Sequence, residues 1–232
     1  GLVMCELKRR DLLLGASAML LYGCGDTEKY NQGKDFYPVA DYYGRIVHWG
    51  KNTTININTD ANSAGNSTLI NYLKAGFNQW VNTLNDVGIS INYDNGSEDV
   101  KVHWLSSSEM ETEAKSSGVL ALARQTKNIY MRTDLESYRA GTTQSTAVHE
   151  FGHMLGIWTH SFDSKDIMYP YSTSVTELSD RDKKTLTDLL YTLTPSINLK
   201  NEPLPIIHSE TGNSVPYMTT YYTTKGCKIH AP

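Results

Sequence analysis

Three residues in one short segment have the types and the spacing of a metal site with a neighbouring base. His149, Glu150 and His153 form the pattern H-E-x-x-H, which is typical of zinc sites carried on a helix. Residues four apart lie on one face of an α-helix, so the two imidazoles can reach one ion. Glu150 lies about 100° round the helix and can hold a water beside that ion without being a ligand. The pattern therefore predicts metal-assisted hydrolysis.

The residues that follow favour a catalytic metal over a chance pair of histidines on an amphipathic helix. Gly156 can end the helix in a left-handed conformation, and His160 supplies a third imidazole. A Met-Tyr-Pro turn begins at Met168, eight residues after His160. Three protein ligands and a water are the arrangement of a catalytic zinc site. We therefore predict zinc bound by the three histidines.

This segment resembles the metzincin metallopeptidases, and within them the matrixins, whose signature is H-E-x-x-H-x-x-G-x-x-H followed by a Met-turn. One position departs from the pattern. The family's third-ligand position is occupied by Thr159, and the histidine comes one residue later, at His160. A hydroxyl is a poor zinc ligand, so we predict His160 as the third ligand and keep Thr159 as the alternative.

The resemblance implies an α+β catalytic domain with a mixed, twisted sheet of about five strands and about three helices, among them the active-site helix before the Met-turn. Hydrophobic periodicity agrees with this. Strands are expected over 53–58, 89–93, 100–104, 118–123 and 128–131, and helices over 66–85, about 142–158 and from Ser179 to just before Pro195.

The resemblance also implies roles for residues around the metal. Glu150 would accept a proton from the zinc-bound water and pass it to the leaving amine. Met168 would lie beneath the zinc in an apolar floor without ligating it, and Asp182 would buttress the Met-turn. The expected activity is that of a zinc-dependent endopeptidase.

Two stretches are expected to bind a protein or peptide substrate, again by resemblance. Residues 118–123 look like the family's edge strand, where Leu120 and Ala121 would pair with the substrate main chain by strand addition. Pro170 and Tyr171 would wall the specificity pocket on the other side of the cleft.

Further metals are less clearly indicated. The stretch where many matrixins bind a structural zinc offers Leu122 and Arg124 and no histidine, so no structural zinc is expected. Calcium is possible, because acidic residues such as Asp94, Asp99 and Asp134 are plentiful. No loop, however, shows a dense pattern of oxygen ligands.

The first 24 residues are expected to be an export signal. Three basic residues precede an apolar run, Leu12–Tyr22, which is too short to span a bilayer. Arg9-Arg10 resembles a twin-arginine signal, and the sequence ending at Cys24 resembles a bacterial lipobox. We expect an exported cell-envelope lipoprotein, on the periplasmic or cell-surface side, anchored in the membrane through a lipid on Cys24. An ordinary secretory signal is the alternative.

The rest of the chain divides into a tether over 25–45, the catalytic domain over 46–195 and a C-terminal tail over 196–232. The chain has three cysteines, which fit no disulfide framework. Cys227 would be the lone thiol outside the signal, idle or, as the minor alternative, an inhibitory thiolate on the zinc. The net charge of −4 gives no electrostatic support for nucleic-acid binding, and a monomer is expected.

Three other functions compete with this one. A gluzincin-type peptidase would take its third ligand from a later glutamate, for which Glu177 is the candidate. A catalytically silent surface-binding lipoprotein usually shows a lost Glu or His, and none is lost here. A zinc hydrolase acting on something other than peptides would use the same residues.

The expected processing can be tested directly. Mass spectrometry of the mature protein should find an N-terminus at Cys24 carrying a lipid. An unmodified terminus at Gly25 or Asp26 would contradict the lipoprotein assignment.

Overall fold

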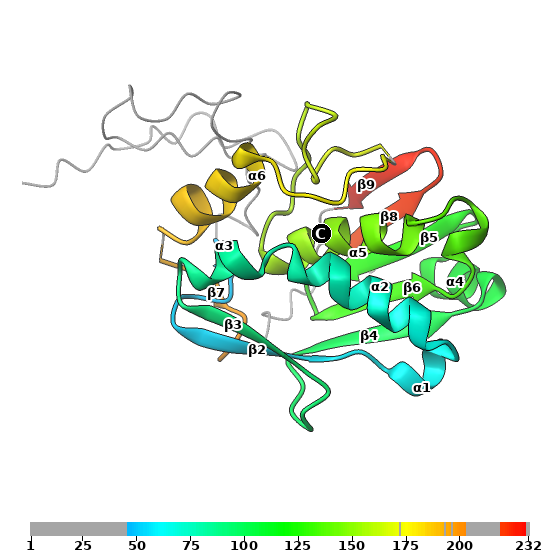
Figure 1. Ribbon diagram of the computed structural model, residues 1–232, viewed down its shortest axis with the longest axis horizontal. Coiled ribbons are helices and arrows are strands. Elements are labelled where there is room, and N and C mark those ends of the chain that lie inside the picture. The colour runs from blue at the N-terminus through cyan, green and yellow to red at the C-terminus, as the bar shows by residue number, and fades with distance from the viewer. Residues whose placement is uncertain (1–45, 172, 193, 196, 203–218, 231–232) are drawn as a thin grey trace, which may run out of the picture.

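The computed structural model describes residues 46–171, 173–192, 194–195, 197–202 and 219–230. The expected export signal with its lipidation site Cys24, and the expected tether over 25–45, lie outside the described residues. Within the described part, helices pack on a central sheet. The C-terminal strands of this sheet lie beside a strand from the middle of the sequence, residues 119–124 (Figure 1).

The sheet is mixed, as expected, and has seven strands in the order β3-β2-β4-β6-β5-β8-β9. Strands β2, β3, β4 and β6 run parallel to one another, whereas β5 is antiparallel to β6 and to β8, and β9 is antiparallel to β8. The strands are β2 (Thr53–Asn58), β3 (Ile89–Tyr93), β4 (Val100–Leu105), β5 (Val119–Arg124), β6 (Asn128–Arg132), β8 (Thr219–Thr223) and β9 (Gly226–His230). A separate parallel pair joins β1 (Val47–His48) to β7 (Ile197–Asn198).

The five expected strands are therefore confirmed to within two residues at each end, but the expected size of the sheet is wrong. Strands β8 and β9 come from the segment expected to be a tail. The catalytic domain thus continues beyond residue 195. The sequence of β8, Thr-Thr-Tyr-Tyr-Thr, consists of residues that favour strands, so this strand has a local signal in the sequence.

Six α-helices occur in the described residues, where about three were expected. They are α1 (Ala61–Ala64), α2 (Ser67–Asn78), α3 (Val81–Asn85), α4 (Ser107–Ala114), α5 (Thr142–Leu155) and α6 (Asp180–Lys184). A 3₁₀ turn covers Leu135–Ser137, and a π-helical segment, Thr185–Leu190, continues α6. No helix in these ranges is long and apolar enough to cross a membrane.

The differences have local causes. The helix expected over 66–85 divides into α2 and α3 at Trp80, which is fully buried and whose indole N–H donates to the carbonyl of Val148. Helix α4 went unpredicted, although Ser106 and Glu109 form a complete capping box at its start.

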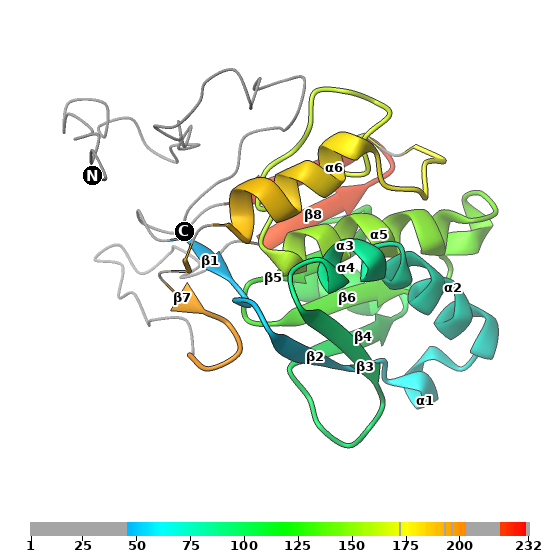
Figure 2. The same cartoon turned by 60° about the vertical axis from the view of Figure 1, so that its left-hand side comes forward.

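Helix α5 packs against α2 and against β5 and β6 of the sheet (Figures 1 and 2). Phe77 of α2 stacks on Phe151 of α5 with ring centroids 4.3 Å apart. On β5, Ala121 and Ala123 belong to this main core, whereas Leu122 packs with Met110 of α4 in a second cluster. Alternate residues of a strand face opposite sides, so α4 covers the face opposite α5.

The contact between α2 and α5 depends on a glycine. A Cβ atom at Gly76 would lie 2.7 Å from the carbonyl oxygen of Gln144 and 2.8 Å from the Cβ of Ala147. Any larger residue would push the two helices apart, and with them the face of α5 that carries His149 and His153.

We predict that Gly76→Ala lowers the free energy of unfolding by about 1–3 kcal/mol through overpacking. Helix propensity alone would raise it by about 1 kcal/mol, so the sign of the change separates the two effects. Thr68→Ala, at an exposed position of the same helix, is the matched control and should be neutral or slightly stabilising. Denaturant unfolding measures both, and a stabilised Gly76→Ala variant would contradict the close contact.

Candidate metal centre

Helix α5 supplies the first two imidazoles, and the chain reverses to supply the third. The helix ends at Leu155, three residues before the expected end at Trp158. Gly156 follows with φ of 122°, a conformation that favours glycine. A Cβ atom there would also lie 2.6 Å from Leu190 and 2.9 Å from the carbonyl oxygen of Val47. The sharp reversal brings His160 back to the helix.

The three imidazoles converge. Ring centroids are 4.8 Å apart for His149 and His153, 5.4 Å for His149 and His160, and 5.1 Å for His153 and His160. The Nε2 atoms of His149 and His153 are 3.1 Å apart. Two nitrogens bound to one tetrahedral zinc would be about 3.4 Å apart, given the usual Zn–N bond lengths. The geometry suits a shared ion.

Hydrogen bonds from the other ring nitrogens fix the orientation of two of these rings. Nδ1 of His149 donates to the carbonyl of Ile167, and Nδ1 of His153 donates to the carbonyl of Ile157, both at 2.7 Å. A carbonyl can only accept, so the proton is on Nδ1 and Nε2 keeps its lone pair. Backbone partners of this kind orient the imidazoles of metal sites.

The protonation states also suit a metal. Burial lowers the pKa of His149 to about 4 and, together with the neighbouring His149, that of His160 to about 3. Burial and the two other rings hold the pKa of His153 well below its usual value. The imidazoles are therefore neutral at pH 7, which is the form that binds metal. Nε2 of His160 is buried without a hydrogen-bond partner among the described residues. This is expected of a nitrogen whose lone pair binds a metal ion.

Glu150 lies beside this cluster and is fully buried. One carboxylate oxygen accepts a hydrogen bond of 2.6 Å from the hydroxyl of Thr220, and the other has no partner among the described residues. Burial raises the pKa of Glu150 to about 8, and the bond from Thr220 acts in the opposite direction. A cation bound by the neighbouring histidines would favour the carboxylate.

The Met-turn lies against the active-site helix. The sulfur of Met168 lies where a Cβ atom at Gly152 would be, so the thioether fills the space beside this glycine. The carbonyl of Met168 accepts from the backbone N–H of Ser161 at 2.9 Å, which closes the loop between His160 and the turn.

Two aspartates hold that loop. Asp166 is buried and accepts hydrogen bonds from the hydroxyls of Ser161 and Ser179, and it pairs with Arg181 at 2.9 Å. Asp182 accepts from the backbone N–H of Ile167 at 2.9 Å. The expectation that Asp182 buttresses the Met-turn is confirmed, and the structure shows how: Ile167 is also the residue whose carbonyl orients His149.

The expectation that residues 118–123 form an edge strand is wrong. Strand β8 pairs along β5, with Ala121 opposite Tyr222 and Arg124 opposite Thr219, so the strand carrying Leu120 and Ala121 is internal. The exposed N–H and C=O groups of an edge are a ready template for another strand. Here a segment of the same chain takes that place.

The segment that contains β8 and β9 also contacts Pro170 and Tyr171, the other stretch predicted to bind substrate. Backbone N–H of Cys227 donates to the carbonyl of Pro170, and a Cβ atom at Gly226 would lie 3.1 Å from the ring of Tyr171. Strands β8 and β9 form a hairpin, residues 219–230, that lies between the two stretches predicted to bind substrate.

Cys227 joins the cluster of histidines. Its thiol is buried, lies 3.8 Å from Nε2 of His153, and together with the three imidazoles offers ligand atoms that all lie within 4.8 Å of one another. In the described part of the chain no other group of three or more His, Cys, Asp or Glu side chains is gathered so closely. Burial and the charge of Glu150 raise the pKa of the thiol well above its usual value. The sequence favoured an idle thiol and carried no motif that would have indicated this position beside the histidines.

The alternative ligand Glu177 lies elsewhere: it is exposed on the loop before α6 and does not belong to the cluster. His160, predicted in preference to Thr159, is gathered with the other two histidines. The acidic residues considered for calcium face cations instead: Asp94 pairs with Lys74, Asp99 with Lys200 and Asp134 with Arg132. Calcium binding stays a prediction.

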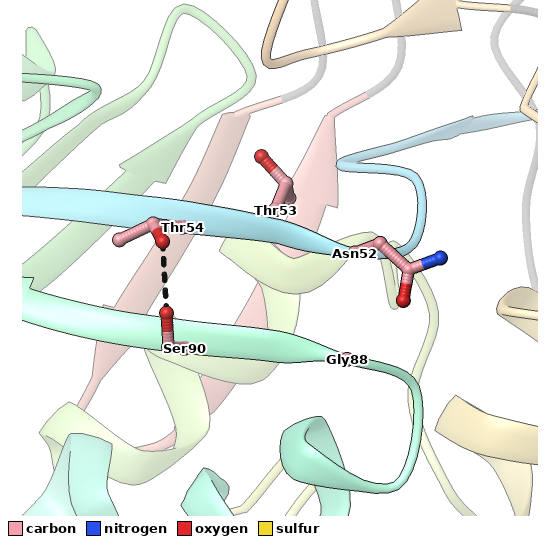
Figure 3. Close-up of a pocket in the computed structure, with 5 residues that line it drawn as sticks. All are labelled: Asn52, Thr53, Thr54, Gly88 and Ser90. Carbon is pink, nitrogen blue, oxygen red and sulfur yellow. Dashed lines mark hydrogen bonds between the residues drawn. The ribbon is translucent and has the colours of Figure 1, made fainter.

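An open polar hollow lies at the other end of the sheet order, between the starts of β2 and β3 (Figure 3). Its lining consists of Asn52, Thr53, Thr54, Gly88 and Ser90, and the hydroxyls of Thr54 and Ser90 are 2.8 Å apart. None of these side chains titrates near neutral pH or is a usual metal ligand, so the chemistry belongs to the histidine cluster.

We predict that Asp182→Ala weakens zinc binding by about 10- to 100-fold, the usual effect of losing an outer partner of a metal ligand. The carboxylate of Asp182 accepts a hydrogen bond from the backbone N–H of Ile167, and the carbonyl of Ile167 orients His149. Competition with a chromophoric chelator measures the affinity. Asp180→Ala, at an exposed position of the same helix, is the control. Equal zinc affinities in the two variants would show that Asp182 has only a structural role.

Comparison with known proteins identifies the family. The matrixin profile matches residues 48–192, while no curated protein matches the sequence. Among solved structures, the fold is similar to one described as the crystal structure of myroilysin, with 15% identity, a TM-score of 0.42, and coverage of 66% of this chain and 93% of that one. The family match spans well over half of the chain and contains all three histidines, Glu150 and Met168. The chain belongs to the matrixin family of zinc metallopeptidases.

Proposed function

We propose that this protein is a zinc-dependent endopeptidase that uses Glu150 as its general base. One observation carries the proposal: three neutral imidazoles converge, and a carboxylate one residue along the same helix lies beside them. The set of three nitrogen donors fits a catalytic zinc, which keeps one position open.

The metal, when bound, supplies Lewis acidity that polarises the scissile carbonyl and makes a nearby water more acidic. The protein's own groups do the rest. Glu150 accepts the proton of the attacking water and donates it to the leaving amine, so the carboxylate must alternate between its two protonation states. Burial alone raises the pKa of Glu150 to about 8, and a bound cation would favour the carboxylate form that accepts the proton.

A substrate strand would bind between β5 and the Pro170–Tyr171 segment. Leu120 and Ala121 would offer main-chain groups for strand addition, and Tyr171, which is 57% exposed, would contact the side chain that follows the cleaved bond. This mode of binding requires the hairpin of residues 219–230 to leave the cleft, because β8 now pairs with β5.

For the cellular location, the proposal rests on residues 1–24 alone. The basic residues, the short apolar run and the lipobox-like sequence at Cys24 support an exported lipoprotein anchored at a membrane surface, acting as a monomer on proteins of the cell envelope or its surroundings.

We predict that Glu150→Gln retains one zinc per chain and the wild-type fold but loses at least about 100-fold in peptide hydrolysis, the usual share of a general base. A quenched fluorescent peptide library measures hydrolysis, with and without a chelator. Because the hairpin lies in the cleft, each protein is assayed as isolated and after limited proteolysis.

Metal analysis supplies the matched control. His149→Ala should lose both zinc and hydrolysis, whereas Glu150→Gln should lose hydrolysis alone. Undiminished turnover by Glu150→Gln, or turnover that survives removal of the metal, would contradict the proposed mechanism.

A further inference from the structure

The hairpin of residues 219–230 makes three separate contacts with the catalytic machinery. The hydroxyl of Thr220 donates to Glu150, the ring of Tyr222 lies edge-on to His149 with centroids 5.4 Å apart, and the thiol of Cys227 joins the three imidazoles. One contact is to the base and two are to the ligands. From this arrangement we propose that the hairpin is a built-in inhibitor, in which Cys227 is the fourth zinc ligand and β8 occupies the place of a substrate strand. The inference rests on the proposed function.

The distances suit coordination by the thiol. In a tetrahedral site with usual bond lengths, a sulfur and a nitrogen ligand lie about 3.6 Å apart. The sulfur of Cys227 is 3.8 Å from Nε2 of His153. Three histidines leave one position open for water, whereas three histidines and a thiolate make the closed, four-coordinate arrangement of a structural zinc. With Cys227 bound, no position is left for the attacking water.

The hairpin contacts the base at the same time. Thr220 is fully buried; its hydroxyl oxygen accepts from the backbone N–H of Ala123 on β5 and donates to the carboxylate of Glu150, both at 2.6 Å. The hydroxyl therefore engages one of the two carboxylate oxygens of Glu150. It also locks β8 to the strand that a substrate would use.

Both walls of the cleft are occupied. On one side β8 satisfies the main chain of β5, and on the other the backbone N–H of Cys227 satisfies the carbonyl of Pro170. The hairpin belongs to the same chain, so it competes with substrate at an effective concentration on the order of millimolar. A free peptide at micromolar concentration would not displace it.

The turn of the hairpin is the accessible part. Thr224 and Lys225 are exposed, while Gly226 and Cys227 are buried. A cut in this turn would leave β8 attached to the domain but separate Cys227 from it covalently. The thiol would then lose the advantage of the tether, so proteolysis there is a route by which Cys227 could be released and the hold of the hairpin weakened.

The coordination can be measured without any assay of activity. X-ray absorption at the zinc edge of the full-length, zinc-loaded protein should show one sulfur at about 2.3 Å with nitrogens at about 2.0–2.1 Å. The sulfur should disappear in Cys227→Ser and remain in a Cys5→Ser, Cys24→Ser double variant. A wild-type site with only nitrogen and oxygen neighbours would overturn the proposal, and since that spectrum needs no variant, a misfolded variant cannot leave the question open.

Activity tests the inhibition. Cys227→Ala should hydrolyse peptides at least about tenfold faster than wild type before any proteolysis, because binding of the hairpin loses one of its attachment points. After limited proteolysis that cuts the turn, the two proteins should become equal. An intact wild type as active as Cys227→Ala would refute the inhibition.

These outcomes separate the two proposals. Sulfur on the zinc with no hydrolysis in any form would keep the hairpin as a ligand-bearing segment and remove the peptidase. Full hydrolysis by the intact wild type without sulfur on the zinc would keep the peptidase and remove the inhibitor.

Discussion

The site depends on a reversal of the chain immediately after helix α5. Gly156 has φ of 122° and no room for a side chain against Val47 and Leu190. A helix can place two histidines on one face, but the third ligand must come from outside the helix. The turn at Gly156 returns the chain so that His160 meets the other two rings. Because the turn packs on β1 and on the segment after α6, distant parts of the chain fix the position of that third imidazole.

Burial then determines the chemistry of the cluster. Water is excluded from His149, Glu150 and His153, and the same exclusion lowers the pKa of the imidazoles and raises that of the carboxylate. Buried polar groups need partners, and the backbone carbonyls of Ile157 and Ile167 supply them. Asp182 extends this support to a second layer through the N–H of Ile167. The helix alone would place two histidines on one face. The loops around it bury the imidazoles, which keeps them neutral, and supply the carbonyls that orient the rings.

The sheet has a different requirement from the buried histidines. A strand that binds substrate must keep main-chain groups available for pairing. An internal strand has its hydrogen bonds satisfied by fixed neighbours, while a strand reserved for substrate keeps one side unpaired. Here β8 satisfies β5 in the described structure. The same hydrogen bonds that would bind a substrate therefore hold the hairpin, and any gain in substrate binding has to exceed what the hairpin contributes. Strand β5 therefore determines both how tightly the hairpin is held and whether a substrate can bind.

Local patterns in the sequence determined a large part of this protein. The H-E-x-x-H spacing, the glycine after it and the Met-Tyr-Pro turn predicted the histidine cluster, since helix periodicity and turn chemistry are local. Alternation predicted β2, β3 and β4 within two residues for the same reason, whereas β5 was expected from the family resemblance. Two unpredicted elements also have local signals in the sequence. Helix α4 begins with a capping box, and β8 is a run of threonine and tyrosine.

Only the tertiary structure decided where the C-terminal strands go. Nothing local distinguishes an idle cysteine from one beside a metal site, because Cys227 and His153 are 74 residues apart and meet only through the pairing of β8 with β5. Pairing between strands far apart in sequence depends on which edge is open after the rest has folded, and on the shape of the cleft beside it. For that reason the ligand set of three histidines could be predicted from sequence, whereas its fourth neighbour and the occupied edge could not.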